Sequence, residues 1–263
     1  MRSADRNAAG PAAPQRAPNR TVLSRHLALL DAFDASSPVL TLAELSGRSA
    51  LPKTTAHRLA GELVAERLLE RAADGRYSLG MRLFEIGELV PRHRSLSTVA
   101  LPVMEDLREV TRQRIHLAVL DGVDVLYVEI LGSGGVPVTS RPGGRWPAHA
   151  TGVGKVMLAY SPLAVVRERI EAGLTRFTPR TITTPGALTR SLQAIRSEGL
   201  AYDREESHLG ISCVAAPIFG TNRKISAGLS VTGRTPSIHP ERLGAAVRTA
   251  ASTISRGLHN AGL

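Results

Sequence analysis

Apolar residues recur at helical spacing near the start of the chain and predict two helices there. Beginning at Val22 and ending before Pro38, the first apolar series is Leu23, Leu27, Leu30 and Phe33. Thr41 and Glu44 have the spacing of a capping box, in which each side chain accepts a hydrogen bond from the other residue's backbone N–H. A second, short helix is therefore expected after Thr41, and Gly47 is placed where the chain can turn.

A third helix and a hairpin are predicted after this turn. Pro52 suits the first position of a helix, because its missing backbone N–H costs nothing there. The inner face of this helix has i, i+3, i+4, i+7 spacing and consists of Ala56, Leu59, Ala60 and Leu63. A strand begins at Leu68, Asp74-Gly75 is a hairpin signal, and a second strand returns beside the first. This order of elements is typical of a winged helix-turn-helix, predicted here over residues 21–80.

The next segment is predicted to be a linker helix over residues 81–96. Leu83, Ile86 and Val90 lie at helical spacing within it, and Pro91 breaks or kinks it. These three apolar residues are candidates for a dimer seam. Packing against the first helix of the chain explains their spacing equally well.

Residues 97–263 alternate between helical and strand-like runs. The predicted helices lie at about 97–112, from 152, from 162, over 184–198 and over 240–258. The predicted strands are the two runs on either side of Asp121-Gly122 and the segments 136–140, 213–218 and 225–232. Helices mixed with antiparallel-style strands predict an α+β domain of the kind that senses a small molecule.

Composition narrows the class of protein. Hydrophobic residues make up 43% of the 263 positions, enough for two compact domains, and no run approaches the roughly 18 apolar residues of a membrane span. Residues 1–20 lack the apolar stretch of a secretory signal and are expected to form a disordered basic arm. The single cysteine excludes an internal disulfide and a multi-cysteine zinc site. A cytoplasmic protein is the simplest interpretation.

The net charge of +10 suggests a nucleic-acid partner, but the distribution of charge weakens that argument. Residues 21–94 contain ten Lys or Arg and nine Asp or Glu, so the candidate DNA-binding domain is nearly neutral. The positions of the individual charges, rather than the net charge, must therefore decide whether this domain binds nucleic acid. In a helix-turn-helix, the start of the second helix faces the base edges of the major groove, and wing residues can contact phosphate. The candidate DNA-binding residues are Lys53, Thr54, Thr55, His57, Arg58, Arg71 and Arg76.

Each of these residues taken alone is explained as part of a solvated helix face. The ordered series of capping box, turn, second helix and wing favours duplex DNA as the partner. Motifs of catalysis, by contrast, are incomplete. Around Gly154-Lys155, His149 stands where a phosphate-binding loop has its first glycine, and Val156 stands where it needs Ser or Thr. The histidines show no H-E-x-x-H spacing either, so we expect no enzyme, no cofactor and no metal site.

Five sequence blocks carry a resemblance to a known family. In order, they are ALPKTTAHRLAGELVAERLL, DGRYSLGMRLFEIG, HLAVLDGVDVLYVE, HATGVGKVMLA and DREESHLGISCVAAPIF. From about Val22 to Leu258 the chain resembles the isocitrate-lyase-regulator (IclR) family of bacterial transcription factors. The resemblance implies a winged helix-turn-helix, a linker helix and a C-terminal effector-binding domain with a GAF- or PAS-like fold. It also implies a homodimer, often paired into a homotetramer, that binds a palindromic double-stranded DNA operator.

The resemblance further implies a small-molecule pocket in the C-terminal domain, with a small organic carboxylate as the effector. Carried over by position, the effector-binding residues are His149, Ala150, Thr151, Gly152 and Val153 on one side, and Asp203, Cys213, Ser230 and Thr232 on the other. Glycine permits close approach of the backbone, and free N–H groups at a helix start attract anions. Cys213 is also explained as a small buried hydrophobe, and His149 as a structural histidine.

Three details of this region depart from the family's pattern or bear on the ligand. Thr232 stands where the family often has serine, and Arg204 follows Asp203 where an acid is common. Arg145 and Trp146 lie close to the mouth of the expected pocket, which is compatible with a bulkier or aromatic acid.

These observations predict a ligand-responsive transcriptional regulator of catabolic genes. Repression is the family's commoner mode, so a repressor is expected, released or rearranged on its operator when the organic acid binds. Two alternatives come from other classes of protein. One is an enzyme built on the C-terminal domain, and the other is an architectural DNA-binding protein without an effector.

Overall fold

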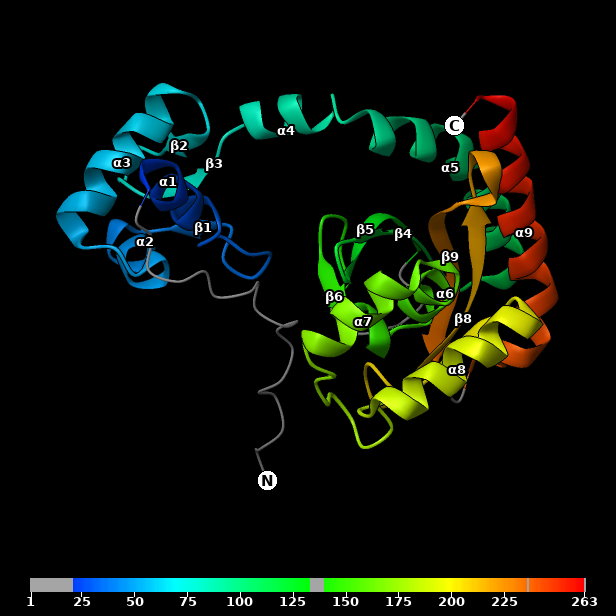
Figure 1. Cartoon of the computed structure of the whole chain (residues 1–263). Helices are drawn as coiled ribbons and strands as arrows, with labels where there is room; N and C mark the ends of the chain where they lie inside the picture. Colours follow the sequence, from blue (N-terminus) through cyan, green and yellow to red (C-terminus); the bar gives the residue numbers. More distant parts are fainter. Residues whose placement is uncertain (1–20, 133–139, 236, 263) are drawn as a thin grey trace. The chain divides into compact units, whose positions relative to one another are not determined.

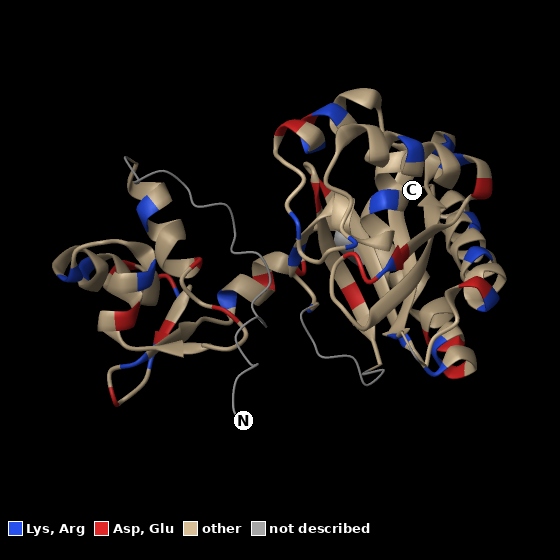
Figure 2. Ribbon diagram, turned by 90° about the horizontal axis from the view of Figure 1, so that it is seen from below, with Lys and Arg blue, Asp and Glu red and all other residues tan. Residues whose placement is uncertain are grey.

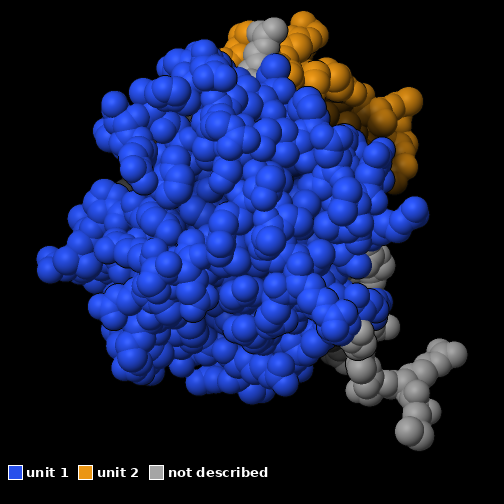
Figure 3. All heavy atoms as spheres, turned by 90° about the vertical axis from the view of Figure 1, so that its right-hand side faces the viewer, with its two compact units in different colours: residues 1–13, 95–263 blue, residues 14–94 orange. Residues whose placement is uncertain are grey.

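The chain forms two compact units that divide between Arg94 and Ser95 (Figure 3). The computed structural model describes residues 21–262 except 133–139 and 236. The arm predicted at 1–20 and most of the strand predicted at 136–140 lie outside the described residues. Each unit has its own buried core.

Three helices and a small antiparallel sheet enclose the core of the N-terminal unit (Figure 1). They are α1 (Val22–Leu30), α2 (Leu42–Ser49), α3 (Lys53–Ala65), β1 (Val39–Leu40), β2 (Leu69–Arg71) and β3 (Tyr77–Leu79). The strands pair in the order β1-β3-β2. The core draws on all three helices and the sheet and includes Leu29, Leu45, Leu59, Leu69 and Tyr77. The architecture confirms the predicted winged helix-turn-helix.

The start of α2 is as predicted, but the turn after it is not. Glu44 N donates to Thr41 Oγ1 at 3.3 Å and Thr41 N donates to Glu44 Oε2 at 2.7 Å, which completes the capping box. Gly47 was expected at the turn but lies inside α2, and the left-handed residue that ends the helix is Ala50, with φ 54°. A single glycine costs a helix only about 1 kcal/mol and does not by itself end it. Pro52 is the N-cap of α3 rather than its first residue.

The predicted linker helix is two pieces. The helix α4 (Arg82–Gly87) is short, and α5 (Pro91–Thr111) already begins at the proline that was expected to break or kink the linker. Proline is well suited to the first position of a helix because the N–H it lacks has no partner there. The helix expected from about residue 97 is therefore the later part of α5.

An antiparallel sheet is the centre of the C-terminal unit. Its strands are β4 (Arg114–Asp121), β5 (Asp124–Leu131), β6 (Arg145–Pro147), β7 (Ala201–Arg204), β8 (Ile211–Phe219) and β9 (Ile225–Arg234). They pair in the order β6-β5-β4-β9-β8-β7, and every described pairing is antiparallel. The short strands β1, β6 and β7 were not expected from the sequence.

Helices cover both faces of this sheet (Figure 1). Apolar residues of α5 and α9 (Pro240–Asn260) pack on one face. The other face is covered by α6 (Gly152–Tyr160), α7 (Leu163–Glu171) and α8 (Pro185–Glu198), and the 3-10 turn Ala148–Ala150 leads into α6. A second 3-10 turn, Thr221–Arg223, joins β8 to β9. This arrangement confirms the predicted α+β class and is consistent with a GAF- or PAS-like domain.

Candidate functional site

The outer side of α3 presents the residues predicted to contact DNA. Lys53, Thr54, His57 and Arg58 are exposed, whereas Thr55 is only partly exposed. The opposite side of the helix is buried in the core of the unit. A helix that follows a tight turn and exposes its polar first turns has the geometry of a recognition helix.

Arg58 belongs to a charged chain that reaches from α3 to α1. Its Nη1 forms an ion pair with Glu62, one turn further along the helix. The other Glu62 oxygen lies 2.9 Å from His26 Nε2, and His26 Nδ1 lies 2.9 Å from the carbonyl oxygen of Val22. Both ring nitrogens of His26 therefore lie within hydrogen-bond distance of an oxygen atom. The Arg58 guanidinium is thereby held against the helix face.

The two predicted wing residues lie on either side of the β2–β3 turn and are both exposed. Arg76 Nε donates to Asp74 Oδ2 at 2.7 Å, and the Arg71 guanidinium lies 5.6 Å from the centre of the Tyr77 ring. Figure 2 shows basic and acidic residues interspersed in this unit. Any attraction to phosphate must therefore come from local groups of cations, because the net charge of the unit is close to zero.

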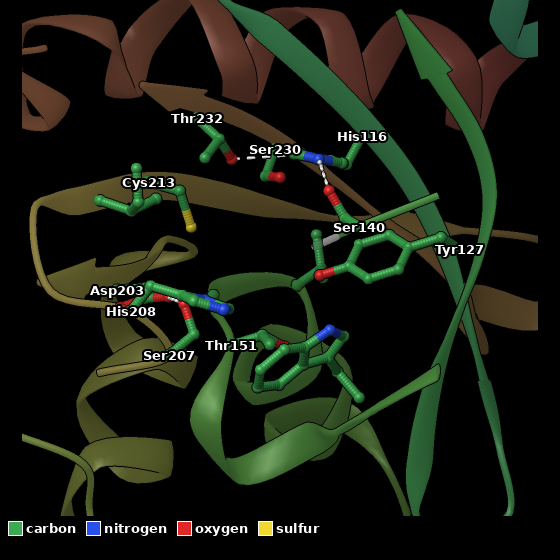
Figure 4. Close-up of a pocket in the computed structure, with 14 residues that line it drawn as sticks. His116, Tyr127, Ser140, Thr151, Asp203, Ser207, His208, Cys213, Ser230 and Thr232 are labelled. Atoms are coloured by element: carbon green, nitrogen blue, oxygen red, sulfur yellow. Dashed lines mark hydrogen bonds between the residues drawn. The ribbon is translucent and has the colours of Figure 1, made fainter. Parts of the chain in front are cut away.

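A cavity lies in the C-terminal unit where the start of α6 meets the sheet (Figure 4). Seven of the nine predicted effector-binding residues line it: Thr151, Gly152, Val153, Asp203, Cys213, Ser230 and Thr232. The other lining residues are His116, Tyr127, Ser140, Trp146, Ser207, His208 and Ile211. Of these seven, the sequence had pointed only to Trp146.

Strand register explains why these polar residues meet. Cys213 lies opposite both Asp203 and Thr232, and Ser230 lies opposite His116. Residues directly opposite each other in an antiparallel pair share a face of the sheet. Chain neighbours of these residues point to the other face, toward α5 and α9, and those that join the apolar core there are Ile115, Leu117, Val214, Leu229 and Val231. The alternation of faces along β4 places His116 on the cavity side. The sequence alone could not reveal this, because it does not show how β4 and β9 pair.

The remaining two predicted residues do not line the cavity. His149 and Ala150 belong to the 3-10 turn before α6, and both are fully buried. His149 Nε2 lies 3.0 Å from the carbonyl oxygen of Thr175, on the loop that follows α7. Burial lowers the pKa of His149, which favours a neutral imidazole in this position.

Tight packing brings the start of α6 against the cavity wall. Thr151 Oγ1 accepts a hydrogen bond from Gly154 N at 3.0 Å and caps the helix. A Cβ atom on Gly152 would lie 2.6 Å from Cys213 Sγ, and one on Gly154 would collide with the backbone of Ala148. Glycine is therefore required at both positions, and the positive end of the helix dipole adjoins the cavity.

Two buried acids share one buried lysine beside the cavity. Asp203 accepts hydrogen bonds from Glu206 N at 2.7 Å and from Ser207 Oγ at 2.7 Å. Lys155 forms an ion pair with Glu206 and donates to the carbonyl oxygen of Tyr202 at 2.7 Å. Burial raises the pKa of both carboxyls, although the Lys155 charge opposes the shift.

The thiol and the rings around the cavity are uncharged. Burial raises the pKa of Cys213 to about 12, so its thiol stays protonated. Burial also lowers the pKa of His116 to about 3, and this neutral ring lies 3.1 Å from Thr232 Oγ1 and 2.9 Å from Ser140 Oγ. The His116 ring lies 5.2 Å from that of Tyr127.

On another side of the cavity, the rings of Trp146 and His208 lie 4.8 Å apart. Aromatic rings therefore line the cavity from three strands, β4, β5 and β6, and from the loop after β7. Within the described ranges, no three His, Cys, Asp or Glu side chains group as metal ligands. None of the described helices combines the length and apolar character needed to cross a lipid bilayer.

Comparisons with known proteins agree over nearly the whole chain. The IclR helix-turn-helix domain matches residues 22–73, and the bacterial transcriptional regulator IclR C-terminal domain matches residues 90–256. The regulator BhcR of Paracoccus denitrificans is 37% identical, covering 90% of this chain and 86% of its own length. The transcriptional repressor IclR of Escherichia coli is 30% identical, covering 89% of this chain and 88% of its own.

A solved structure is similar to this chain over both units. It is the crystal structure of an IclR homologue from Microbacterium hydrocarbonoxydans complexed with 4-hydroxybenzoate, with a TM-score of 0.84 and 33% sequence identity. The match covers 90% of this chain and 99% of the other. With both domain families matched in order and the fold shared, the chain belongs to the IclR family of bacterial transcriptional regulators.

Proposed function

We propose that this family member is a cytoplasmic repressor of catabolic genes that a small organic acid releases from, or rearranges on, a palindromic operator. The observation that carries the proposal is the cavity, which is lined by seven of the nine residues that the family resemblance implies for the effector site, in a unit joined to a winged helix-turn-helix. Several relatives are named repressors or operon regulators, among them the acetate operon repressor of Salmonella typhimurium. Because these names are those of regulators, we propose no catalytic activity.

We propose that Lys53, Thr54, Thr55, His57 and Arg58 read the operator, and that Arg71 and Arg76 grip its phosphates. The test replaces Thr54 and Arg58 by Ala and measures binding to a duplex from upstream of the protein's own gene. Loss of one good base contact weakens binding by about tenfold or more. Lys224→Ala, in the other unit, is the matched control for a lost surface cation and should bind normally. Unchanged affinity and site preference of the Thr54/Arg58 variant would exclude the assignment.

We propose that the effector is a carboxylic acid, and that an aromatic acid fits the cavity better than a purely aliphatic one. The support is the pair of ring contacts, His116–Tyr127 and Trp146–His208, together with the 4-hydroxybenzoate complex of the Microbacterium homologue. Trp146 is the single tryptophan of the chain and lines the cavity, so its fluorescence reports occupancy. In such a titration Ser230→Val should weaken binding about tenfold, because a polar group of the ligand would lose the Ser230 hydroxyl as its hydrogen-bond partner. A full response from that variant would remove Ser230 from the site.

We propose that two copies associate through the apolar run between β3 and α5. Its large exposed side chains are Leu79, Met81, Phe84, Ile86, Leu89 and Val90. Two of the three predicted seam residues belong to this run, whereas Leu83 is partly buried. Phe84→Asp should give monomers in light scattering, and Leu163→Asp, an exposed apolar residue of α7, should not. A Phe84→Asp protein that keeps the wild-type mass would exclude this interface.

A further inference from the structure

Among the described residues of the C-terminal unit, three cations are buried, and they differ in their partners. Arg114, Lys155 and Arg169 are 5%, 2% and 5% exposed. Lys155 is paired with Glu206, and Arg169 Nη1 lies 2.7 Å from Asp124 Oδ1. Arg114 has no carboxylate at ion-pair distance among the described residues. The sequence of residues 133–139 (SGGVPVT), which precede Ser140 in the chain, contains no Asp or Glu.

The hydrogen bonds of Arg114 do not make up for the missing anion. Its Nη2 donates to the carbonyl oxygen of Ser140 at 2.9 Å. Its Nε is buried without a partner in the described part of the chain. Burial lowers the pKa of this guanidinium, yet arginine keeps its charge in proteins. An unpaired buried charge is strongly unfavourable, so a protein gains stability by supplying it with an anion.

Arg114 stands directly behind one wall of the cavity. It lies opposite Thr232 in the β4–β9 pairing, two residues before His116, and therefore shares the face of the sheet that the cavity occupies. Ser140, which receives its hydrogen bond, lines the same wall (Figure 4). Burial is the main reason why the pKa of His116 is lowered, and the Arg114 charge lowers it further, so the charge acts on a residue of the cavity lining.

The opposite side of the cavity already contains acids. Asp203 lines it, and Glu206 lies just behind, beside the start of α6. The two carboxyls offset both Lys155 and the positive end of the α6 dipole. The cavity therefore has a cationic side at β4 and an acidic side at β7.

We propose that Arg114 determines the specificity of the cavity for anions, and that the effector binds with its carboxylate toward β4 and a hydrogen-bond donor toward Asp203. This inference rests on the proposed effector function and adds an orientation and a residue to it. Arg114 does not line the cavity itself, so it acts on the ligand mainly through its charge. It also acts by holding Ser140, which lines the cavity next to His116.

The experiment compares acids with their neutral amides as probes. Trp146 fluorescence is titrated with benzoate and benzamide, 4-hydroxybenzoate and 4-hydroxybenzamide, and phenylacetate and phenylacetamide. In wild type the acid of at least one pair should bind about tenfold more tightly than its amide. Arg114→Met should abolish this preference and leave amide binding in place, whereas Arg114→Lys should retain most of it. A structural role alone would weaken acid and amide together.

Two controls keep the outcomes separate. Lys224→Met, an exposed cation replaced in the same way, should leave the acid preference unchanged. Thermal unfolding without ligand should show Arg114→Met at least as stable as wild type, because an unpaired buried charge has been removed. If wild type prefers acids and Arg114→Met keeps the preference, the Arg114 inference fails and the proposed effector class stands. If wild type binds none of the acids, or binds the amides equally well, both fail.

Discussion

Lys155→Met should destabilise the C-terminal unit, because it leaves two buried carboxyls without their cation. Lys155 is 2% exposed and pairs with Glu206, and its charge opposes the rise in the pKa of Asp203 that burial causes. Removing one partner of a buried ion pair costs about 3–5 kcal/mol. For a unit of about 150–250 residues, where 1 kcal/mol shifts Tm by about 2–4 °C, the expected fall in Tm is about 6–20 °C. The methionine fills much of the same space, so the loss measures charge rather than packing.

The deficit should depend on pH in a defined direction. Burial raises the pKa of Asp203 and Glu206 above their usual values of 3.8 and 4.5. A carboxyl whose pKa is raised by folding contributes stability that is fully present below its unfolded value and is lost as pH rises through the folded value. Without Lys155 both folded values rise further. The variant should therefore approach wild type as the pH falls toward 4 and depart from it most near neutrality.

The assay is thermal unfolding by circular dichroism of the full-length protein between about pH 4.5 and pH 8. Lys224→Met replaces an exposed lysine and is the matched control, expected to follow wild type throughout. A Lys155→Met protein within 2 °C of wild type near neutral pH would refute the argument. A deficit that is the same at every pH would refute the electrostatic part of it and point to lost packing.

Three further substitutions test local features of the two units. Gly61→Ala should stabilise the N-terminal unit by about 1 kcal/mol in chemical denaturation, because Gly61 lies inside α3 with open space at its Cβ position. Gly154→Ala should destabilise the C-terminal unit by about 3 kcal/mol in the same assay, because the added methyl collides with the Ala148 backbone; wild-type stability would contradict the close packing of α6. Glu62→Gln should release Arg58 and reduce the ratio of specific to random DNA binding about fivefold in a gel-shift titration, and an unchanged ratio would show that the ion pair does not orient Arg58.

Elements specified by neighbouring residues could be predicted from the sequence. The capping box at Thr41, the buried stripe of α3 and the long amphipathic α9 all depend on spacings of three to four residues, which the sequence displays directly. Two helix boundaries were missed because proline and glycine are ambiguous signals. Gly47 lies inside a helix, and Pro91 begins one instead of breaking it.

The lining of the cavity could be predicted only in part, since it depends on register between strands far apart in sequence. The family's positions located residues on α6, β7, β8 and β9 that the structure brings together. Tyr127 and His208 were missed because one belongs to an apolar run that reads as core, and the other to an irregular loop after the short strand β7. His149 was included because it opens the segment that also contains Thr151, but in the 3-10 turn its ring lies against the carbonyl oxygen of Thr175 instead.

The buried cations connect the stability of the C-terminal unit with its proposed response to a ligand. Lys155 and Arg169 have their anions within the chain, so their charges are neutralised whether or not the cavity is filled. Arg114 has none among the described residues, so an anionic ligand would relieve a cost that the unliganded protein bears. Its strand β4 lies at the centre of the sheet, and its Nη2 donates to the carbonyl oxygen of Ser140, which lines the cavity. An anionic ligand gains this free energy only in a state of the protein that places it near Arg114, and any ligand-driven change of state requires such a difference in affinity between states.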